Sequence, residues 1–301
     1  MTEQPSPSAQ PVALPGVTIG KGQSLAVIAG PCVAESFELC LSIGRAVRER
    51  CGELGLSYVF KASFDKANRS SAGSARGPGV AEGLAMIVAV GRELGVPVTT
   101  DIHLPEQAAM AAEASGGGVD LLQVPAFLCR QTDLLVACGA TGRAVNIKKG
   151  QFMSPAEMGT AVEKVKSAAP NAERPAPNAQ VMLTERGTFF GYHRLVNDFA
   201  GLGDLMEHGC PVCFDVTHST QLPGATAGVG GVTSGGRPER APLLARAAVA
   251  AGVDAVFIES HPDPGAAVSD GATMLTVDRT LRLLGDLAKL RAAMADFEAG
   301  A

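Results

Sequence analysis

The stretch LAVIAGPCVAESFELCLSIGRAVRERCGELGLSYVFKAS, residues 25–63, decides the fold. An apolar run at 25–31 precedes a segment at 37–55 with apolar residues at helical spacing, and a second apolar run follows at 58–63. Gly55 closes the helical segment, where a left-handed residue is favoured. Both runs are apolar nearly throughout, which is typical of parallel strands covered by helices. The stretch therefore predicts a strand–helix–strand unit.

The same alternation continues along the chain. Six further apolar runs lie at 97–102, 121–126, 144–149, 181–187, 212–218 and 255–261. Helical patterns lie at 80–95, 105–115, 130–139, 155–168, 195–208, 240–251 and 273–298. Eight strands alternating with eight helices predict an α/β fold, a (β/α)8 TIM barrel, whose usual length of ~250 residues fits this chain. A doubly wound open sheet is the alternative.

The first residues differ in composition from the rest. Residues 1–16 are rich in Pro, Ser, Gln and Ala and are expected to form a flexible N-terminal tail. No comparable linker follows, so we expect residues 17–301 to form a single barrel domain. Residues 17–24 are expected to form a short hairpin over the barrel floor.

Composition excludes several classes of protein. Hydrophobic residues make up 46% and charged residues 18% of the 301 residues, which excludes a disordered chain. Lys and Arg number 25 against 30 Asp and Glu, and aromatic residues make up 4%, which argues against nucleic-acid binding. No apolar run approaches the ~18 residues of a membrane span, and no signal peptide is evident. Seven irregularly spaced cysteines predict reduced thiols and a cytoplasmic protein.

Polar residues follow the predicted strands, and in a barrel this end carries the chemistry. They are Cys32, Glu35, Lys61, Lys66, Asn68, Arg69, Asp101, His103, Gln123, Lys148, Lys149, Glu185, Arg186, Asp215, His218, Glu259 and His261. Five of the cations are predicted to gather in one mouth: Lys61, Lys66, Arg69, Lys148 and Arg186. Phosphate or carboxylate groups of a substrate are natural partners for such a cluster.

A second set of these residues suits a metal. The thiol of Cys32, the imidazole of His218 and the carboxylates of Glu259 and Asp270 form a mixed donor set for a first-row divalent ion. Their separation along the chain matches no metal-binding motif. From the residues alone, a metal site and ordinary polar strand ends both remain open.

Two other features have simpler interpretations. Residues 210–213, CPVC, resemble a redox dithiol, but they lie at the start of a strand, on the expected floor of the barrel, so packing is favoured. Residues 221–240 are rich in Gly, lack apolar periodicity, and are expected to form a mobile lid over the mouth. Packing roles are also expected for Cys40, Cys51, Cys129 and Cys138.

Nine blocks occur in an order that resembles the family of 3-deoxy-D-manno-octulosonate 8-phosphate synthases over roughly residues 25–285. They are IAGPCVAES (28–36), FKASFDKANRSS (60–71), RGPG (76–79), TTDIH (99–103), LQVPAFLCRQTDLL (122–135), NIKKGQF (146–152), ERGTFFGY (185–192), DVTHSTQLPG (215–224) and FIESHPDP (257–264). The block at 64–71 is the most diagnostic, since related heptulosonate 7-phosphate synthases usually carry a KPRTS-like block there.

The resemblance implies condensation of phosphoenolpyruvate with D-arabinose 5-phosphate and water, for lipopolysaccharide precursor synthesis, in a homotetrameric (β/α)8 barrel. It implies that phosphoenolpyruvate is held by Lys61, Ser63, Lys66, Gln123, Ala126, Lys148 and Arg186. The sugar phosphate would meet Arg69, Ser70 and, from a neighbouring subunit, Arg130. Asn68 and Asp101 would lie near the reacting end of the sugar, and catalytic roles are expected for Lys66, Asn68, Asp101 and His218.

The resemblance also bears on the metal. Metal-dependent members of the family carry Cys after the first strand and metal-independent members carry Asn, so Cys32 and Gly150 place this chain with the dependent form. The implied ligands are Cys32, His218, Glu259 and Asp270, with Fe, Zn, Mn and Co all open. Three alternatives remain: a heptulosonate synthase using erythrose 4-phosphate, a non-catalytic phosphometabolite-binding barrel, and a Schiff-base aldolase.

Overall fold

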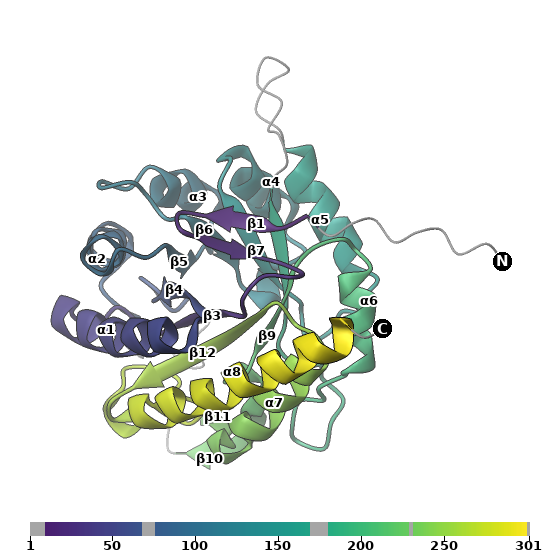
Figure 1. Ribbon diagram of the computed structural model, residues 1–301. Coiled ribbons are helices and arrows are strands. Elements are labelled where there is room, and N and C mark those ends of the chain that lie inside the picture. Colours follow the sequence, from purple (N-terminus) through teal and green to yellow (C-terminus); the bar gives the residue numbers. More distant parts are fainter. Residues whose placement is uncertain (1–9, 68–75, 169–179, 229–230, 300–301) are drawn as a thin grey trace.

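The computed structural model describes residues 10–67, 76–168, 180–228 and 231–299. Eight parallel strands form its centre (Figure 1). They are β3 (Ala26–Gly30), β4 (Ser57–Lys61), β5 (Val98–Asp101), β6 (Leu121–Val124), β7 (Ala144–Lys148), β8 (Val181–Glu185), β9 (Val212–Asp215) and β12 (Ala255–His261). Neighbours in sequence pair in order, and β12 pairs with both β9 and β3. The sheet is therefore closed, which confirms the predicted barrel and excludes the open sheet.

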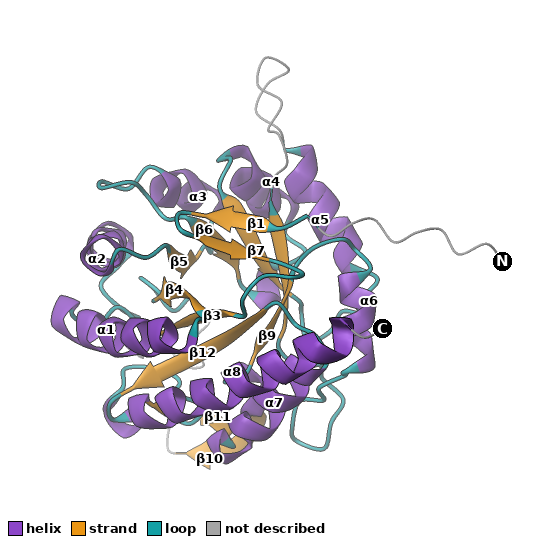
Figure 2. Ribbon diagram, viewed as in Figure 1, coloured by secondary structure: helices purple, strands orange, loops and turns teal. Residues whose placement is uncertain are grey.

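Helices surround the barrel on its outer side (Figure 2). They are α1 (Phe37–Leu54), α2 (Val80–Leu94), α3 (Pro105–Ala112), α4 (Thr132–Ala140), α5 (Met158–Ser167), α6 (Ala200–Met206), α7 (Ala241–Ala250) and α8 (Val277–Ala299). Helix α1 starts where the Ser36 side chain accepts a hydrogen bond from Leu39 N, at 3.1 Å. It ends at Gly55, with φ 67°, as the sequence predicts. The main apolar core lies between the strands and this helical layer.

A hairpin closes the floor of the barrel. Strands β1 (Val12–Leu14) and β2 (Val17–Ile19) pair antiparallel, and their buried side chains join those at the amino-terminal strand ends, such as Ala26 and Leu121. The assignment of residues 12–16 to a flexible tail was therefore wrong. Two short alternating runs, too brief to stand out in sequence, bury one face against the floor.

The segment expected to be a lid contains a second hairpin. Strands β10 (Gln221–Gly228) and β11 (Gly231–Gly236) pair antiparallel, and the turn η3 (Pro238–Arg240) follows. The described residues of this segment thus include regular backbone pairing, which does not require apolar alternation. The remaining short elements are η1 (Ala126–Leu128), η2 (His218–Thr220), η4 (Pro264–Ala266) and β13 (Leu275–Thr276).

All seven cysteines are free and buried. Cys210 belongs to the outer core and Cys213 to the core at the floor, so the CPVC pair packs as expected and forms no disulfide. Among the helices described, none is long and apolar enough to cross a membrane.

Candidate active site

A cavity of about 920 Å³ lies at the carboxyl-terminal ends of the strands. Loops after β4, β5, β6, β7, β8, β9 and β12 all contribute to its wall. Eight residues predicted from the sequence line it: Lys66, Asp101, Ala126, Lys148, Arg186, His218, Glu259 and Asp270. Barrel closure thus brings together side chains that are up to 204 residues apart in sequence (Lys66 to Asp270).

Other predicted residues lie beneath the wall or away from it. Lys61, Ser63 and Gln123 are fully buried. Ser63 donates a hydrogen bond to Asp101, and Gln123 Nε2 donates to Asp101 Oδ1 at 2.6 Å, so both hold a residue of the wall. Arg130 is exposed and does not line the cavity of its own chain. Three further predicted residues fall outside the described part of the chain: Asn68, Arg69 and Ser70.

The cations of the site are largely paired with carboxylates of the protein. Lys61 pairs with Glu259. Lys66 Nζ lies 3.8 Å from Glu259 Oε1 and 3.9 Å from Asp101 Oδ2. Lys148 Nζ lies 2.6 Å from Asp215 Oδ2. Substrate anions are therefore not the only partners of this cluster, because a buried ammonium requires a counter-ion in the folded protein itself.

Arg186 is the exception. Its Nη2 donates a 2.6 Å hydrogen bond to the amide oxygen of Gln221, while Nη1 is buried and has no hydrogen-bond partner among the described residues. No carboxylate of the described residues forms an ion pair with it, and burial lowers the pKa of the guanidinium. A buried guanidinium with a free donor in a cavity wall is a site for a phosphate or carboxylate.

The carboxylates remain ionised despite their burial. Burial alone would raise the pKa of Asp101, but Lys66, Lys61 and Lys148 outweigh it and hold that pKa far below its ordinary value. For Asp215, His218 and Lys148 likewise outweigh burial and lower the pKa. The cavity wall therefore alternates fixed positive and negative charges.

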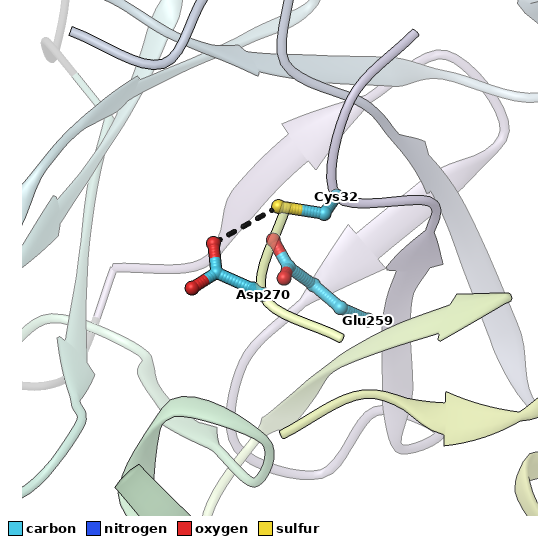
Figure 3. Close-up of side chains that lie close together, drawn as sticks. All are labelled: Cys32, Glu259 and Asp270. Atoms are coloured by element: carbon cyan, nitrogen blue, oxygen red, sulfur yellow. Dashed lines mark hydrogen bonds between the residues drawn. The ribbon is translucent and has the colours of Figure 1, made fainter. Parts of the chain in front are cut away.

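Three possible metal ligands point toward one another at the cavity: Glu259 and Asp270 line it, and Cys32 lies beside them (Figure 3). One donor atom from each of Cys32, Glu259 and Asp270 lies within 4.8 Å of the others. Cys32 Sγ donates to Asp270 Oδ2 at 3.1 Å, and within the described part of the chain the buried Glu259 Oε2 has no hydrogen-bond partner. Asp270 has a φ of 51°, an uncommon value for a non-glycine residue that is frequent at functional sites.

His218, the fourth predicted ligand, lies beside this group. Its Nε2 is 3.7 Å from Glu259 Oε2, and its Nδ1 is 2.8 Å from Asp215 Oδ2. A carboxylate on one ring nitrogen leaves the other facing the cluster, which is the usual arrangement for a metal-binding histidine. Burial and the nearby Glu259 raise the pKa of the Cys32 thiol well above its ordinary value, and a divalent cation would favour the thiolate. The four residues therefore fit a soft or borderline divalent metal.

Comparison with known proteins identifies relatives of this chain. A model of the DAHP synthetase I family matches residues 3–294. The chain belongs to this family. A relative named 2-dehydro-3-deoxyphosphooctonate aldolase, from Nitratidesulfovibrio vulgaris, is 52% identical over 88% of this chain and 91% of its own length. Relatives with the same name are 48% identical in a Cyanothece strain (93% of this chain, 97% of the relative) and 49% identical in Xanthomonas oryzae (92% and 95%).

In this member of the DAHP synthetase I family, the sequence predicts no role for two residues that hold the site together. Asp215 contacts both Lys148 and His218, and its position three residues before His218 was the available signal. Asn146 donates to Gln123 Oε1 at 3.0 Å and accepts from Thr184 Oγ1 at 2.6 Å. A polar residue inside an otherwise apolar strand indicates such an interior network.

Proposed function

We propose that this chain condenses phosphoenolpyruvate with D-arabinose 5-phosphate and water, giving 3-deoxy-D-manno-octulosonate 8-phosphate and phosphate for lipopolysaccharide precursor synthesis. The curated relatives share the name 2-dehydro-3-deoxyphosphooctonate aldolase, which supports an enzyme of aldol-type condensation. The observation that carries the proposal is Arg186, a buried guanidinium in the wall of a cavity of about 920 Å³, one nitrogen of which finds no partner among the residues that the structure describes. It supplies a ready partner for an anionic group of phosphoenolpyruvate.

Phosphoenolpyruvate carries two anionic groups, and three of the cations in the wall can bind them. We assign one anionic group to Arg186 and the other to Lys148 and Lys66. Lys148 and Lys66 each keep a carboxylate partner, Asp215 and Asp101 respectively, so substrate anions enter a wall whose charges are already held in place. Such preorganised charges stabilise a transition state without reorganising during the reaction.

The bond changes require charge of both signs. The electron pair of the enol forms the new bond from C3 to the aldehyde carbon, and the aldehyde oxygen takes a proton, which the Lys66 ammonium can supply. Positive charge develops at C2, which the fixed carboxylate of Asp101 stabilises. Water then adds at C2 and returns one proton to Lys66. The bond from C2 to the phosphate oxygen breaks, and the remaining hydroxyl proton goes to the departing phosphate, which leaves a ketone at C2. We place Asn68 beside the reacting end of the sugar.

The sugar phosphate needs cations of its own, and we assign it to Arg69 and Ser70 together with Arg130 of a neighbouring subunit. Arg130 is exposed and does not line the cavity of its own chain, which supports a role across an interface. We therefore propose a homotetramer. A cytoplasmic location follows from the proposed phosphorylated substrates.

We also propose that Cys32, His218, Glu259 and Asp270 hold a divalent ion, either Fe, Zn, Mn or Co. Bound there, it would supply Lewis-acid polarisation and a fixed position for an oxygen ligand. Two observations support this assignment: the buried Glu259 Oε2 has no hydrogen-bond partner in the described ranges, and one nitrogen of His218 faces it.

Phosphate release tests the proposed reaction. The purified protein is given phosphoenolpyruvate with either arabinose 5-phosphate or erythrose 4-phosphate at equal concentration, with and without a chelator. We expect release with the pentose phosphate, loss of release on chelation, and recovery on addition of a divalent ion. Faster release with erythrose 4-phosphate would indicate a heptulosonate synthase, and binding without release would indicate a non-catalytic barrel. Borohydride trapping is expected to give no adduct on Lys61 or Lys148, because both are ion-paired.

A further inference from the structure

Lys149 is a buried charge that the proposed reaction does not use. It follows Lys148 directly, yet Lys148 lines the cavity and Lys149 does not, since successive side chains at a strand end point to opposite sides. Its side chain is only 2% exposed. Burying an ammonium costs free energy unless it is paired, so the partners of Lys149 indicate its role.

The partners of Lys149 come from two adjacent loops. Its Nζ lies 3.2 Å from Met153 O and 3.4 Å from Gly150 O, in the loop after β7. It also donates to Thr188 Oγ1 at 3.0 Å, in the loop after β8, and lies 3.3 Å from Glu185 Oε2, at the end of β8. One ammonium therefore ties together the two loops that follow neighbouring strands.

Glu185 continues this connection to the cavity. Its other oxygen, Oε1, accepts hydrogen bonds from the backbone N–H groups of Arg186, at 2.9 Å, and Gly187, at 2.5 Å. The carboxylate thus fixes the backbone that carries the Arg186 side chain. Gln151 and Phe189, which also line the cavity, lie on the same two loops and are joined by a 2.8 Å hydrogen bond from Phe189 N to Gln151 O.

We propose that the pair Lys149–Glu185 is a positioning unit, which holds the β7 and β8 loops so that Lys148 and Arg186 present their cations to the anionic groups of phosphoenolpyruvate. The identity of the ligand rests on the proposed function. Neither residue of the pair touches the cavity, so its effect passes through the backbone of Lys148 and Arg186. Displacing such cations by about 1 Å weakens an anion site by on the order of 10- to 100-fold.

The test separates positioning from general stability. Lys149→Met removes the tether and leaves Glu185 as an unpaired buried charge, so both the melting temperature and phosphoenolpyruvate affinity should fall. The double variant Lys149→Met/Glu185→Gln removes that unpaired charge, while the Gln oxygen can still accept from the backbone N–H groups. We expect it to regain much of the melting temperature but to bind phosphoenolpyruvate on the order of 10-fold more weakly than wild type by calorimetry. The KM for the sugar phosphate should change much less.

Two further variants complete the test. Thr188→Val keeps the shape of its side chain and removes one partner of Lys149, so affinity for phosphoenolpyruvate should fall by a smaller factor. Lys166→Met, on the exposed side of α5, is the matched control and should leave affinity unchanged. If the folded double variant binds phosphoenolpyruvate as tightly as wild type, the proposal is overturned. If the double variant does not fold, wild-type affinity in Thr188→Val overturns it instead. Absence of phosphate release by the wild-type protein would instead count against the proposed function.

Discussion

At the scale of single residues, Arg186 has the most direct consequence for binding. Arg186→Lys keeps the charge but loses the planar fork that can hold two oxygens of one anion. One lost charge-assisted hydrogen bond costs about 1.5–3 kcal/mol, so the KM for phosphoenolpyruvate should rise about 10- to 100-fold. Arg246→Lys, in an exposed pair with Asp286, is the control and should leave the KM unchanged. Equal KM values in both variants would remove Arg186 from the anion site.

Substitution of Cys32 is expected to affect metal binding, because its thiolate is a proposed ligand. Cys32→Asn replaces a soft thiolate by a hard amide oxygen, so the protein should fold normally but bind the ion at least about tenfold more weakly. Metal content after dialysis, measured by mass spectrometry, checks this. Cys40→Ala removes a buried thiol away from the cluster and is the control. Undiminished metal content in Cys32→Asn would exclude thiolate ligation.

Residue identities were predictable from sequence, but their pairings were not. Lys66, Lys148 and Arg186 were expected at one mouth because each follows a strand, and barrel closure brings them there. Which carboxylate neutralises which ammonium depends on neighbours around the barrel: Asp215 on β9 meets Lys148 on β7. Such a pairing across the barrel interior leaves no periodic signal in the chain. Arg186 stands out only after these pairs are known.

At the scale of elements, the long runs were predictable and the short ones were not. Strand β12 has the predicted bounds, 255–261, because seven consecutive residues are buried on both faces. Helix α1 ends at Leu54, directly before Gly55, which the sequence predicts as its end. Strands β1 and β2 have three residues each, which is too few for a reliable pattern of alternating apolar and polar residues. Their burial depends on a floor that exists only in the folded barrel.

Strands β3 and β4 lie so close together at Gly30 that there is no room for a side chain. A Cβ on Gly30 would lie 1.9 Å from Lys61 O, a backbone atom that cannot move without disturbing Lys61 and its partner Glu259. Gly30→Ala should therefore lower the free energy of unfolding by at least about 1–3 kcal/mol, measured by urea denaturation. Gly52→Ala is the matched control, since a Cβ there meets no atom within 4 Å. It lies in α1 and should stabilise the protein by up to about 1 kcal/mol. Similar effects of both substitutions would contradict the argument.

At the scale of the whole molecule, the buried thiols link stability to alkaline pH. Burial raises the pKa of Cys40, Cys51, Cys138 and Cys213 from 9.0 to about 12. Between these values the unfolded chain releases protons that the folded protein retains. Stability is therefore fully present below pH 9 and falls as pH rises toward 12. The effect is spread over the barrel, because these thiols lie in both the outer core and the floor.

Cys138 allows this linkage to be measured at one position, because burial is the cause that raises its pKa to about 12. Cys138→Ala removes the thiol and leaves a small cavity, whose cost does not depend on pH. In wild type, this thiol should lower the free energy of unfolding by about 1.4 kcal/mol for each pH unit above 9. The destabilisation caused by Cys138→Ala should therefore be smaller at pH 10 than at pH 8 by about 1.4 kcal/mol. Urea denaturation under reducing conditions measures both values. An equal cost at the two pH values would show that this thiol does not keep its proton in the folded state.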